Sequence, residues 1–201
     1  MTDRGRLPGV RSVLVFVLIF FAACGDDASS GEVVSVAVGG CDGLLTTVPA
    51  ETGSHVPVGT PIEWSTDPPA TGTHFGAWAG WNRHYPRLDR GYYVHNAEHG
   101  GIVLLYNCPT GCQDVVDSLL DVARNAEPDP QCTGVVRNRI IVAADPLLPP
   151  DVQVAAVSWT TLYTASCFDP YVTTFTRNRY RRGPEDTCAD GTPLNGSLIA
   201  P

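Results

Sequence analysis

The fold is decided in the stretch Ile102-Val-Leu-Leu-Tyr-Asn-Cys-Pro-Thr-Gly-Cys-Gln-Asp-Val-Val-Asp-Ser-Leu-Leu-Asp-Val-Ala-Arg124, where a strand signal is followed by a helix signal. Its first five residues form a continuous apolar run of strand length, which predicts a buried strand. From Gln113 onward, apolar residues recur at helical intervals and alternate with aspartates. This pattern predicts a helix over about 113–126 that Pro128 ends. Thr110 precedes Gln113 at the spacing of a capping box.

The segments on either side predict more strands and a second helix. Asp169-Pro170 is a strong helix start, followed by a helix over 171–181 that Gly183 would end. The expected strands are 33–38, 56–62, 102–106, 135–143 and 152–163. Strands interspersed with helices in this order predict a single compact α+β domain over 34–188, with a small, mostly antiparallel sheet and two main helices. Residues 189–201 are expected to form a loose tail.

Residues 63–93 are rich in turn formers and aromatic side chains, which predicts a long ordered loop on the domain surface. Its aromatic residues alternate with arginines and allow two interpretations. They form a platform for an envelope protein or glycan, or they simply cover the sheet. The residues concerned are Trp78, Trp81, Tyr92 and Tyr93.

The N-terminus has the pattern of an export signal. Three arginines precede the apolar run 13–21, and small residues then lead to Cys24. This predicts a lipoprotein signal peptide over 1–23, with Cys24 as the acylated first residue of the mature chain. A flexible tether is expected over 24–33. The chain is therefore predicted to be exported and anchored by lipid to the bacterial cell envelope, on the periplasmic or outer surface.

The remaining cysteines support export. They are even in number, and an oxidising compartment favours disulfides over free thiols. Cys108 and Cys112 do not have the Cys-x-x-Cys spacing of redox enzymes. Sequence alone does not choose among the fifteen possible pairings. The candidates are Cys41, Cys108, Cys112, Cys132, Cys167 and Cys188.

Net charge narrows the possible partners. The chain carries a formal charge of −8, and loss of residues 1–23 would remove three arginines and one aspartate, giving −10. A domain this acidic is repelled by nucleic acid and by anionic lipid headgroups. No nucleic-acid function is expected.

All five histidines fall within residues 55–99, and this concentration predicts the position of a functional site. His95 and His99 are four residues apart and share one face in either a strand or a helix. His74 follows a turn shaped by proline and glycine and is suited to be a third ligand. Three imidazoles with Glu98 or water would suit copper or zinc. His55 is a possible further ligand, and Glu98 would be a ligand or would orient an imidazole.

Two other functions stay open at this stage. The histidines would be structural in a non-catalytic interaction module of the cell envelope, or the same residues would serve a metal-dependent enzyme with an open coordination position. His95-Asn-Ala-Glu98-His99 formally matches the His-x-x-Glu-His pattern of inverted zinc proteases. That chemistry needs a stable helix, whereas the neighbouring Tyr92-Tyr93-Val94 and Gly100-Gly101 are typical of β-structure and turns. We therefore do not expect a protease.

Two histidine motifs resemble a known family. Asp67-Pro-Pro-Ala-Thr-Gly-Thr-His74 and Val94-His-Asn-Ala-Glu-His-Gly-Gly-Ile-Val103 are followed by Arg139-Ile-Ile-Val142 and Ala155-Ala-Val-Ser-Trp159. Together they resemble the bacterial family called domain of unknown function 3105 over about residues 53–183. The resemblance implies an exported or membrane-anchored protein with a shared site, and it implies no activity. Its pattern falls on His55, His74, His95, Glu98 and His99, whereas His84 and the cysteines look like additions in this chain.

Overall fold

The computed structural model describes residues 32–200. The predicted signal peptide, Cys24 and the tether up to residue 31 lie outside the described residues. Within residues 32–200, no helix is both long and apolar enough to cross a membrane.

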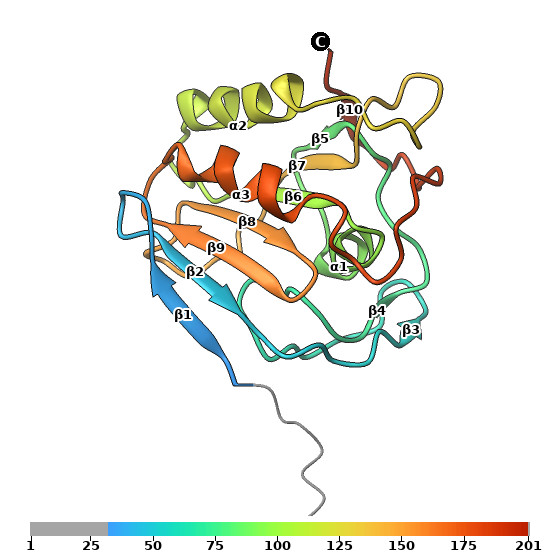
Figure 1. The fold of residues 1–201 in the computed structure, drawn as a ribbon, viewed down its shortest axis with the longest axis horizontal. Coiled ribbons are helices and arrows are strands. Elements are labelled where there is room, and N and C mark those ends of the chain that lie inside the picture. The colour runs from blue at the N-terminus through green and yellow to red at the C-terminus, as the bar shows by residue number, and fades with distance from the viewer. Residues whose placement is uncertain (1–31, 201) are drawn as a thin grey trace, which may run out of the picture. The chain divides into compact units, whose positions relative to one another are not determined.

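One eight-stranded sheet organises the domain (Figure 1). Its strand order is β1-β2-β9-β8-β6-β7-β5-β10, and a separate parallel pair is formed by β3 and β4. Neighbouring strands in the large sheet are antiparallel except for β6–β7 and β5–β7, so the α+β prediction with a mostly antiparallel sheet is confirmed. The strands are β1 (Val34–Ala37), β2 (Leu44–Thr47), β3 (His55–Val56), β4 (His74–Phe75), β5 (Arg83–Tyr85), β6 (Ile102–Tyr106), β7 (Ile140–Ala144), β8 (Val154–Ser158), β9 (Thr161–Ala165) and β10 (Ser197–Leu198).

Three helices cover the two faces of this sheet: α1 (Arg90–Glu98), α2 (Gln113–Asn125) and α3 (Tyr171–Arg179). The side chains of β6 alternate between two cores, as the pleat of a strand requires. Val103 and Leu105 pack in the core of α1, and Ile102 and Leu104 pack in the core of α2 and α3. The apolar run 102–106 is therefore buried on both faces, as predicted.

Both helices expected from the sequence are present. α2 begins at Gln113, but Cys112 is its N-cap and no side chain caps it, so the predicted capping box is wrong. At α3, the backbone N–H of Tyr171 donates to Asp169 Oδ1 over 2.7 Å, as expected of a capping aspartate.

The single strand predicted over 152–163 is a hairpin. β8 and β9 pair antiparallel around Trp159 and Thr160. Thr160 adopts a φ of +61°, a conformation that turns usually give to glycine or asparagine. The turn therefore carries no sequence signal, which is why one long strand was expected.

The prediction of β-structure around His95 is also wrong, because residues 90–98 form α1. Asp89 caps its start by accepting from the Gly91 N–H, and Gly100 ends it with a φ of +77°. A glycine just past the last helical residue is a helix stop rather than evidence against a helix. Complete burial of Tyr93 and Val94 outweighs the β-propensity of these residues.

The predicted aromatic loop and the predicted loose tail both contain regular secondary structure and buried residues. Within 63–93 the chain forms β4, β5 and the start of α1, and Trp81 and Tyr93 are buried in the core. Only Trp78 and Tyr92 of the four aromatics keep partial exposure. Near the C-terminus, β10 pairs with β5 and Ile199 is buried, so residues 197–199 are part of the domain.

All six cysteines of the domain form disulfides: Cys41–Cys167, Cys108–Cys112 and Cys132–Cys188. The expectation of three structural bridges is confirmed, and these bridges indicate an oxidising environment.

Candidate metal centre

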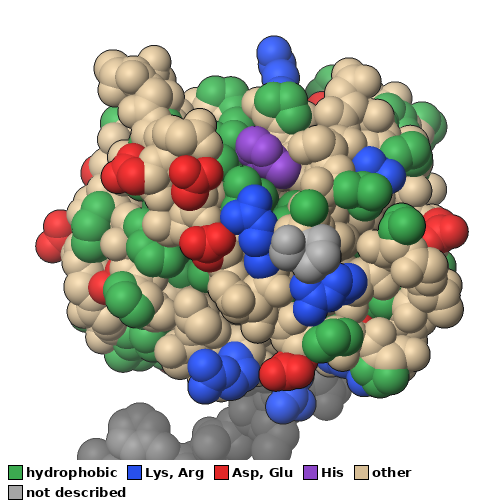
Figure 2. All heavy atoms as spheres, turned by 90° about the horizontal axis from the view of Figure 1, so that it is seen from above, with side chains coloured by type: hydrophobic (Ala, Val, Ile, Leu, Met, Phe, Trp, Pro, Cys, Tyr) green, Lys and Arg blue, Asp and Glu red, His purple; other side chains and the backbone are tan. Residues whose placement is uncertain are grey.

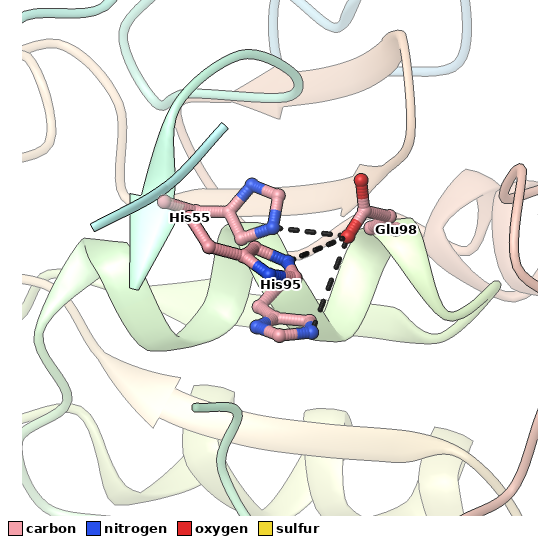
Figure 3. A group of neighbouring side chains, drawn as sticks. His55, His95 and Glu98 are labelled. Atoms are coloured by element: carbon pink, nitrogen blue, oxygen red, sulfur yellow. Dashed lines mark ion pairs between the residues drawn. The ribbon is translucent and has the colours of Figure 1, made fainter. Parts of the chain in front are cut away.

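Two separate elements bring four of the predicted site residues together. In α1, His95 and Glu98 are three residues apart and so project from the same side. The parallel pairing of β3 with β4 places His55 opposite His74. Figure 3 shows His55, His95 and Glu98 pointing toward one another, with the Glu98 carboxylate at the common point.

The ligand atoms converge on one oxygen. Glu98 Oε2 lies 3.0 Å from His74 Nε2, 3.5 Å from His55 Nε2 and 4.0 Å from His95 Nε2. One ligand atom from each of the four residues lies within 4.8 Å of every other. His74, His95 and Glu98 are buried, whereas the His55 side chain is 50% exposed. We call these four residues the His3Glu group.

Backbone carbonyls orient two of the imidazoles. His74 Nδ1 donates to Gly72 O over 2.8 Å, and His95 Nδ1 donates to Phe75 O over 2.6 Å. A carbonyl oxygen can only accept, so both Nδ1 atoms carry the proton. Each ring therefore directs its Nε2 toward Glu98, and that nitrogen carries a lone pair in the neutral form of the ring. Metal-binding histidines are typically held in this way.

The arrangement has too many acceptors. His74 Nε2 and Glu98 Oε2 are buried 3.0 Å from each other, and among residues 32–200 neither has a hydrogen-bond donor unless one of the two carries a proton. Buried polar atoms are rarely left in that state, because desolvation without a partner is costly. A proton on His74 would serve one pair of atoms, whereas one metal ion would serve all four ligands. Tetrahedral zinc with bonds of about 2.0–2.1 Å separates its ligand atoms by about 3.4 Å, which the distances to Glu98 bracket.

Burial keeps the imidazoles available as ligands. Desolvation lowers the pKa of His95 to about 4, assisted by the neighbouring His74, His99 and His55 and opposed by the hydrogen bond to Phe75. At neutral pH the His95 ring is therefore uncharged, the form that binds metals.

His99 lies beside the group and is not one of the four converging residues. It is the C-cap of α1, and its ring stacks on that of His95 with centroids 4.8 Å apart. Its Nδ1 lies 3.3 Å from Glu185 Oε2. Desolvation lowers its pKa to about 4 as well, assisted by His74 and His55. Four-residue spacing placed both histidines on one face, but Glu98 and not His99 reaches the common point.

The inverted-protease pattern was rejected because β-structure was expected around His95, and the presence of α1 removes that reason. The positions of the side chains nevertheless do not fit the pattern. The protease would use His95 and His99 as ligands and Glu98 as general base. Here Glu98 converges with the imidazoles, and His99 does not. His84 is outside the group as well, and its Nε2 forms a hydrogen bond of 2.9 Å with the Tyr106 hydroxyl.

Two glycines near the group were not predicted as part of the site. Gly72, whose carbonyl holds His74, has a φ of +95° that favours glycine. A Cβ at Gly53 would lie 2.2 Å from Glu98 Oε1, so a larger residue there would displace the Glu98 carboxylate. The glycine in Thr71-Gly72-Thr73 is the signal that could have indicated a special turn.

A second buried polar cluster holds the end of the same helix. Arg139 Nη1 donates to the carbonyl of His99 over 2.9 Å, and Arg139 Nη2 lies 2.7 Å from both Asp129 Oδ2 and Asp186 Oδ1. The Tyr180 hydroxyl donates to Asp129 Oδ2 over 2.9 Å. We call these four residues the Arg139 network.

A cavity of about 860 Å³ lies between α2 and α3. None of the His3Glu residues lines it. The histidine cluster is therefore not the floor of that cavity.

Comparison with known proteins agrees with the motifs. A family model described as a protein of unknown function (DUF3105) matches residues 55–191, which include the whole His3Glu group. No curated protein and no solved structure matches significantly. Because the family match covers more than half of the chain, the protein belongs to the DUF3105 family.

Proposed function

We propose that the His3Glu group binds one transition-metal ion, zinc or copper, and that metal binding is the function of this domain. The observation that carries the proposal is the convergence of three imidazole nitrogens and one carboxylate oxygen on one buried point. A proton between His74 Nε2 and Glu98 Oε2 would satisfy only those two atoms, whereas His55 and His95 also face the carboxylate.

The chemistry of the ligands selects the ion. Imidazole nitrogen suits zinc and copper, whereas calcium and magnesium require mainly oxygen ligands. Within residues 32–200, the six cysteines are bound in disulfides and offer no thiolate that would favour copper(I). Zinc and copper(II) remain as the candidates, and competition between them in the same preparation would rank them.

The other two functions have less support. Purely structural histidines would explain the hydrogen bonds from His74 and His95 to carbonyls, but not the convergence of three imidazole nitrogens on one carboxylate oxygen. A metal-dependent enzyme needs space for a substrate at the metal, and the cavity between α2 and α3 is lined by other residues. The half-exposed His55 is the ligand that a substrate or water would displace most easily.

We also propose that the protein is exported and anchored to the envelope through Cys24. The lipobox-like Ala22-Ala23-Cys24 and three disulfides support this placement. Mass spectrometry of the N-terminal peptide from native membranes would test it. A diacylated Cys24 is expected, and an unmodified Cys24 would refute the anchor.

The test of metal binding is elemental analysis of the full chain after zinc or copper loading and removal of excess ion. We expect about one ion per chain in the wild type and almost none in His74→Ala or His95→Ala. His84→Ala is the matched control, because it removes a histidine outside the group and should leave metal content unchanged. Copper(II) should also quench tryptophan emission, since the Trp78 ring lies 4.9 Å from that of His95.

Circular dichroism must show that each variant is folded. A wild-type chain that retains no ion after loading at neutral pH would refute the proposal. Equal metal loss in the His84 variant would show that binding is not specific to the His3Glu group.

A further inference from the structure

The first strand of the sheet presents an open edge. Among residues 32–200, β1 is the outermost strand and pairs only with β2 (Figure 1). All four of its residues are exposed. Val33, Val34 and Val36 are 57%, 51% and 52% exposed, although valine is normally buried.

This edge lacks the usual protection against pairing. Natural edge strands carry charges, prolines or bulges that prevent another strand from adding. The segment Val33-Val-Ser-Val-Ala-Val38 contains none of these residues, and Ser35 is its only polar side chain. Elsewhere, as on the face in Figure 2, acidic and basic side chains are interspersed among apolar ones.

The hairpin that carries this edge is fixed to the domain. Cys41 in its turn is bonded to Cys167, and the Gly40 N–H donates to Asp169 at the start of α3. Both strands of the hairpin precede residue 55, where the family match begins. The hairpin is therefore a rigid feature of this chain outside the matched family region.

The alternation of the strand shows which backbone groups are free. Val38 N donates to Gly43 O, so the backbone groups of residues with the same parity, Val34 and Val36, face β2. The N–H and C=O groups of Ser35 and Ala37 then face outward. The same alternation, continued toward the N-terminus, predicts that the backbone groups of Val33 also face outward.

We propose that a second copy of this chain pairs antiparallel with β1, about a twofold axis centred on Ser35. This register places Ser35 opposite its own equivalent and Val33 opposite Ala37, so all outward-facing groups find partners. Val34 lies opposite Val36 on one face of the joined sheet, and this contact buries part of their exposed surface.

Charge and hydrogen bonding favour this partner over a lipid surface. Two copies with a charge of −8 each repel one another, and an uncharged strand is the place where that repulsion is smallest. A hydrocarbon phase would leave the edge N–H and C=O groups without partners. A second copy satisfies them.

The assembly stops at two chains. Twofold pairing uses the same edge on both copies and leaves none free. The opposite edge of the sheet is β10, which has only two residues and matches β1 poorly. Because the joined edge is short, its interface is smaller than that of a stable dimer, and a dissociation constant in the micromolar range, below about 100 µM, is expected.

The experiment measures the protein mass of the full chain in a neutral detergent by light scattering, over a range of concentrations. Ser35→Arg places like charges opposite one another and should weaken dimerisation at least tenfold. Val135→Arg is the matched control, because Val135 is 67% exposed and lies outside the edge. This control should dimerise like the wild type.

A cross-linking variant tests the register. Opposed residues that exchange hydrogen bonds have Cα atoms about 5.5 Å apart, within reach of a disulfide. Ser35→Cys should give an intermolecular disulfide under mild oxidation, and Val135→Cys should not.

Three results would overturn the proposal. A wild-type chain that stays monomeric at about 100 µM would mean that lipid or another segment of the chain covers the edge. A dimer that Ser35→Arg leaves unchanged would lie at another surface. Equal cross-linking of the Ser35 and Val135 variants would reflect random collision. None of these results bears on metal content, which is measured separately.

Discussion

Two buried polar clusters meet at the end of α1, and they differ in how their charges are balanced. In the Arg139 network, a guanidinium lies between two carboxylates and also donates to the helix terminus. In the His3Glu group, three imidazole nitrogens face one carboxylate, and none of the four side chains is a permanent cation.

The difference separates a structural cluster from a binding site. A buried network in which each donor has an acceptor is complete and contributes to a unique fold. A cluster of acceptors alone is unfavourable until a cation enters. Both lie at the last turn of one helix, since Glu98 belongs to the group and His99 O accepts from Arg139. The Arg139 network therefore holds the backbone that carries the metal ligand.

The largest effect should come from breaking the balanced cluster. Arg139→Met would leave Asp129 buried without a counter-charge, and we expect a loss of about 3–5 kcal/mol in the free energy of unfolding. Urea denaturation measures it. Arg124→Met, which breaks the exposed ion pair with Asp121, should cost at most about 1 kcal/mol. Similar losses in the two variants would contradict a structural role for Arg139.

In metal-free protein, the two clusters should lose their contributions to the free energy of unfolding at different pH values. The folded-state pKa of His95 and of His99 is about 4, below the value near 6.5 expected when unfolded. The unfolded chain then binds protons first, so stability is complete above pH 6.5 and falls as pH drops toward 4. The expected loss is on the order of 3 kcal/mol for each of the two histidines.

The carboxylates of the Arg139 network should respond at lower pH. Hydrogen bonds from Arg181 and Arg139, opposed by burial, lower the pKa of Asp186 to about 2. Burial opposes the lower pKa of Asp129, but hydrogen bonds from Gln131, Arg139 and Tyr180 outweigh it. Their contribution is present above pH 3.8 and is lost only below that value. Urea titrations from pH 8 to 3 with a chelator present check this order, and constant stability between pH 6.5 and 4 would refute it.

Glu98→Gln should have opposite effects with and without metal. The amide cannot match a carboxylate as a ligand, so zinc affinity should fall about 100-fold, or about 2.7 kcal/mol. Without metal, the amide NH2 can donate to His74 Nε2, and stability should stay equal or rise. Asp129→Asn is the comparison in the balanced cluster and should be destabilising. If the metal-free Glu98→Gln chain were as unstable as Asp129→Asn, the His3Glu group would be a structural cluster like the Arg139 network and not a binding site.

The smallest loss of zinc affinity is expected from removing one ligand of the His3Glu group, His55. His55 is half-exposed on a strand of two residues, and water can replace its nitrogen on the metal. His55→Ala should therefore weaken zinc binding only about tenfold, or about 1.4 kcal/mol, and His74→Ala far more. Competition with a chromophoric chelator measures both, and equal losses would show that His55 is as essential as the buried ligands.

Local sequence signals determined much of this protein. The apolar run of β6, the amphipathic pattern of α2 and the Asp169-Pro170 start of α3 each report on their own neighbours, and all three elements form where expected. The histidine motifs likewise predicted the family, and four of the five residues they predicted as ligands converge, whereas His99 does not. The even number of cysteines predicted disulfides because pairing depends on compartment chemistry.

Tertiary structure decided the rest, because it depends on contacts between distant residues. Burial made 90–98 a helix despite Tyr92-Tyr93-Val94, and pairing with β5 made the tail a strand. The parallel pairing of β3 with β4 brought His55 beside His74, and the disulfide partners were fixed by the fold. Finally, α1 ends at Glu98, so His99 is its C-cap and lies outside the group, whereas Glu98 lies among the imidazoles. Spacing along one helix could not determine that choice, since the other two ligands come from a different part of the chain.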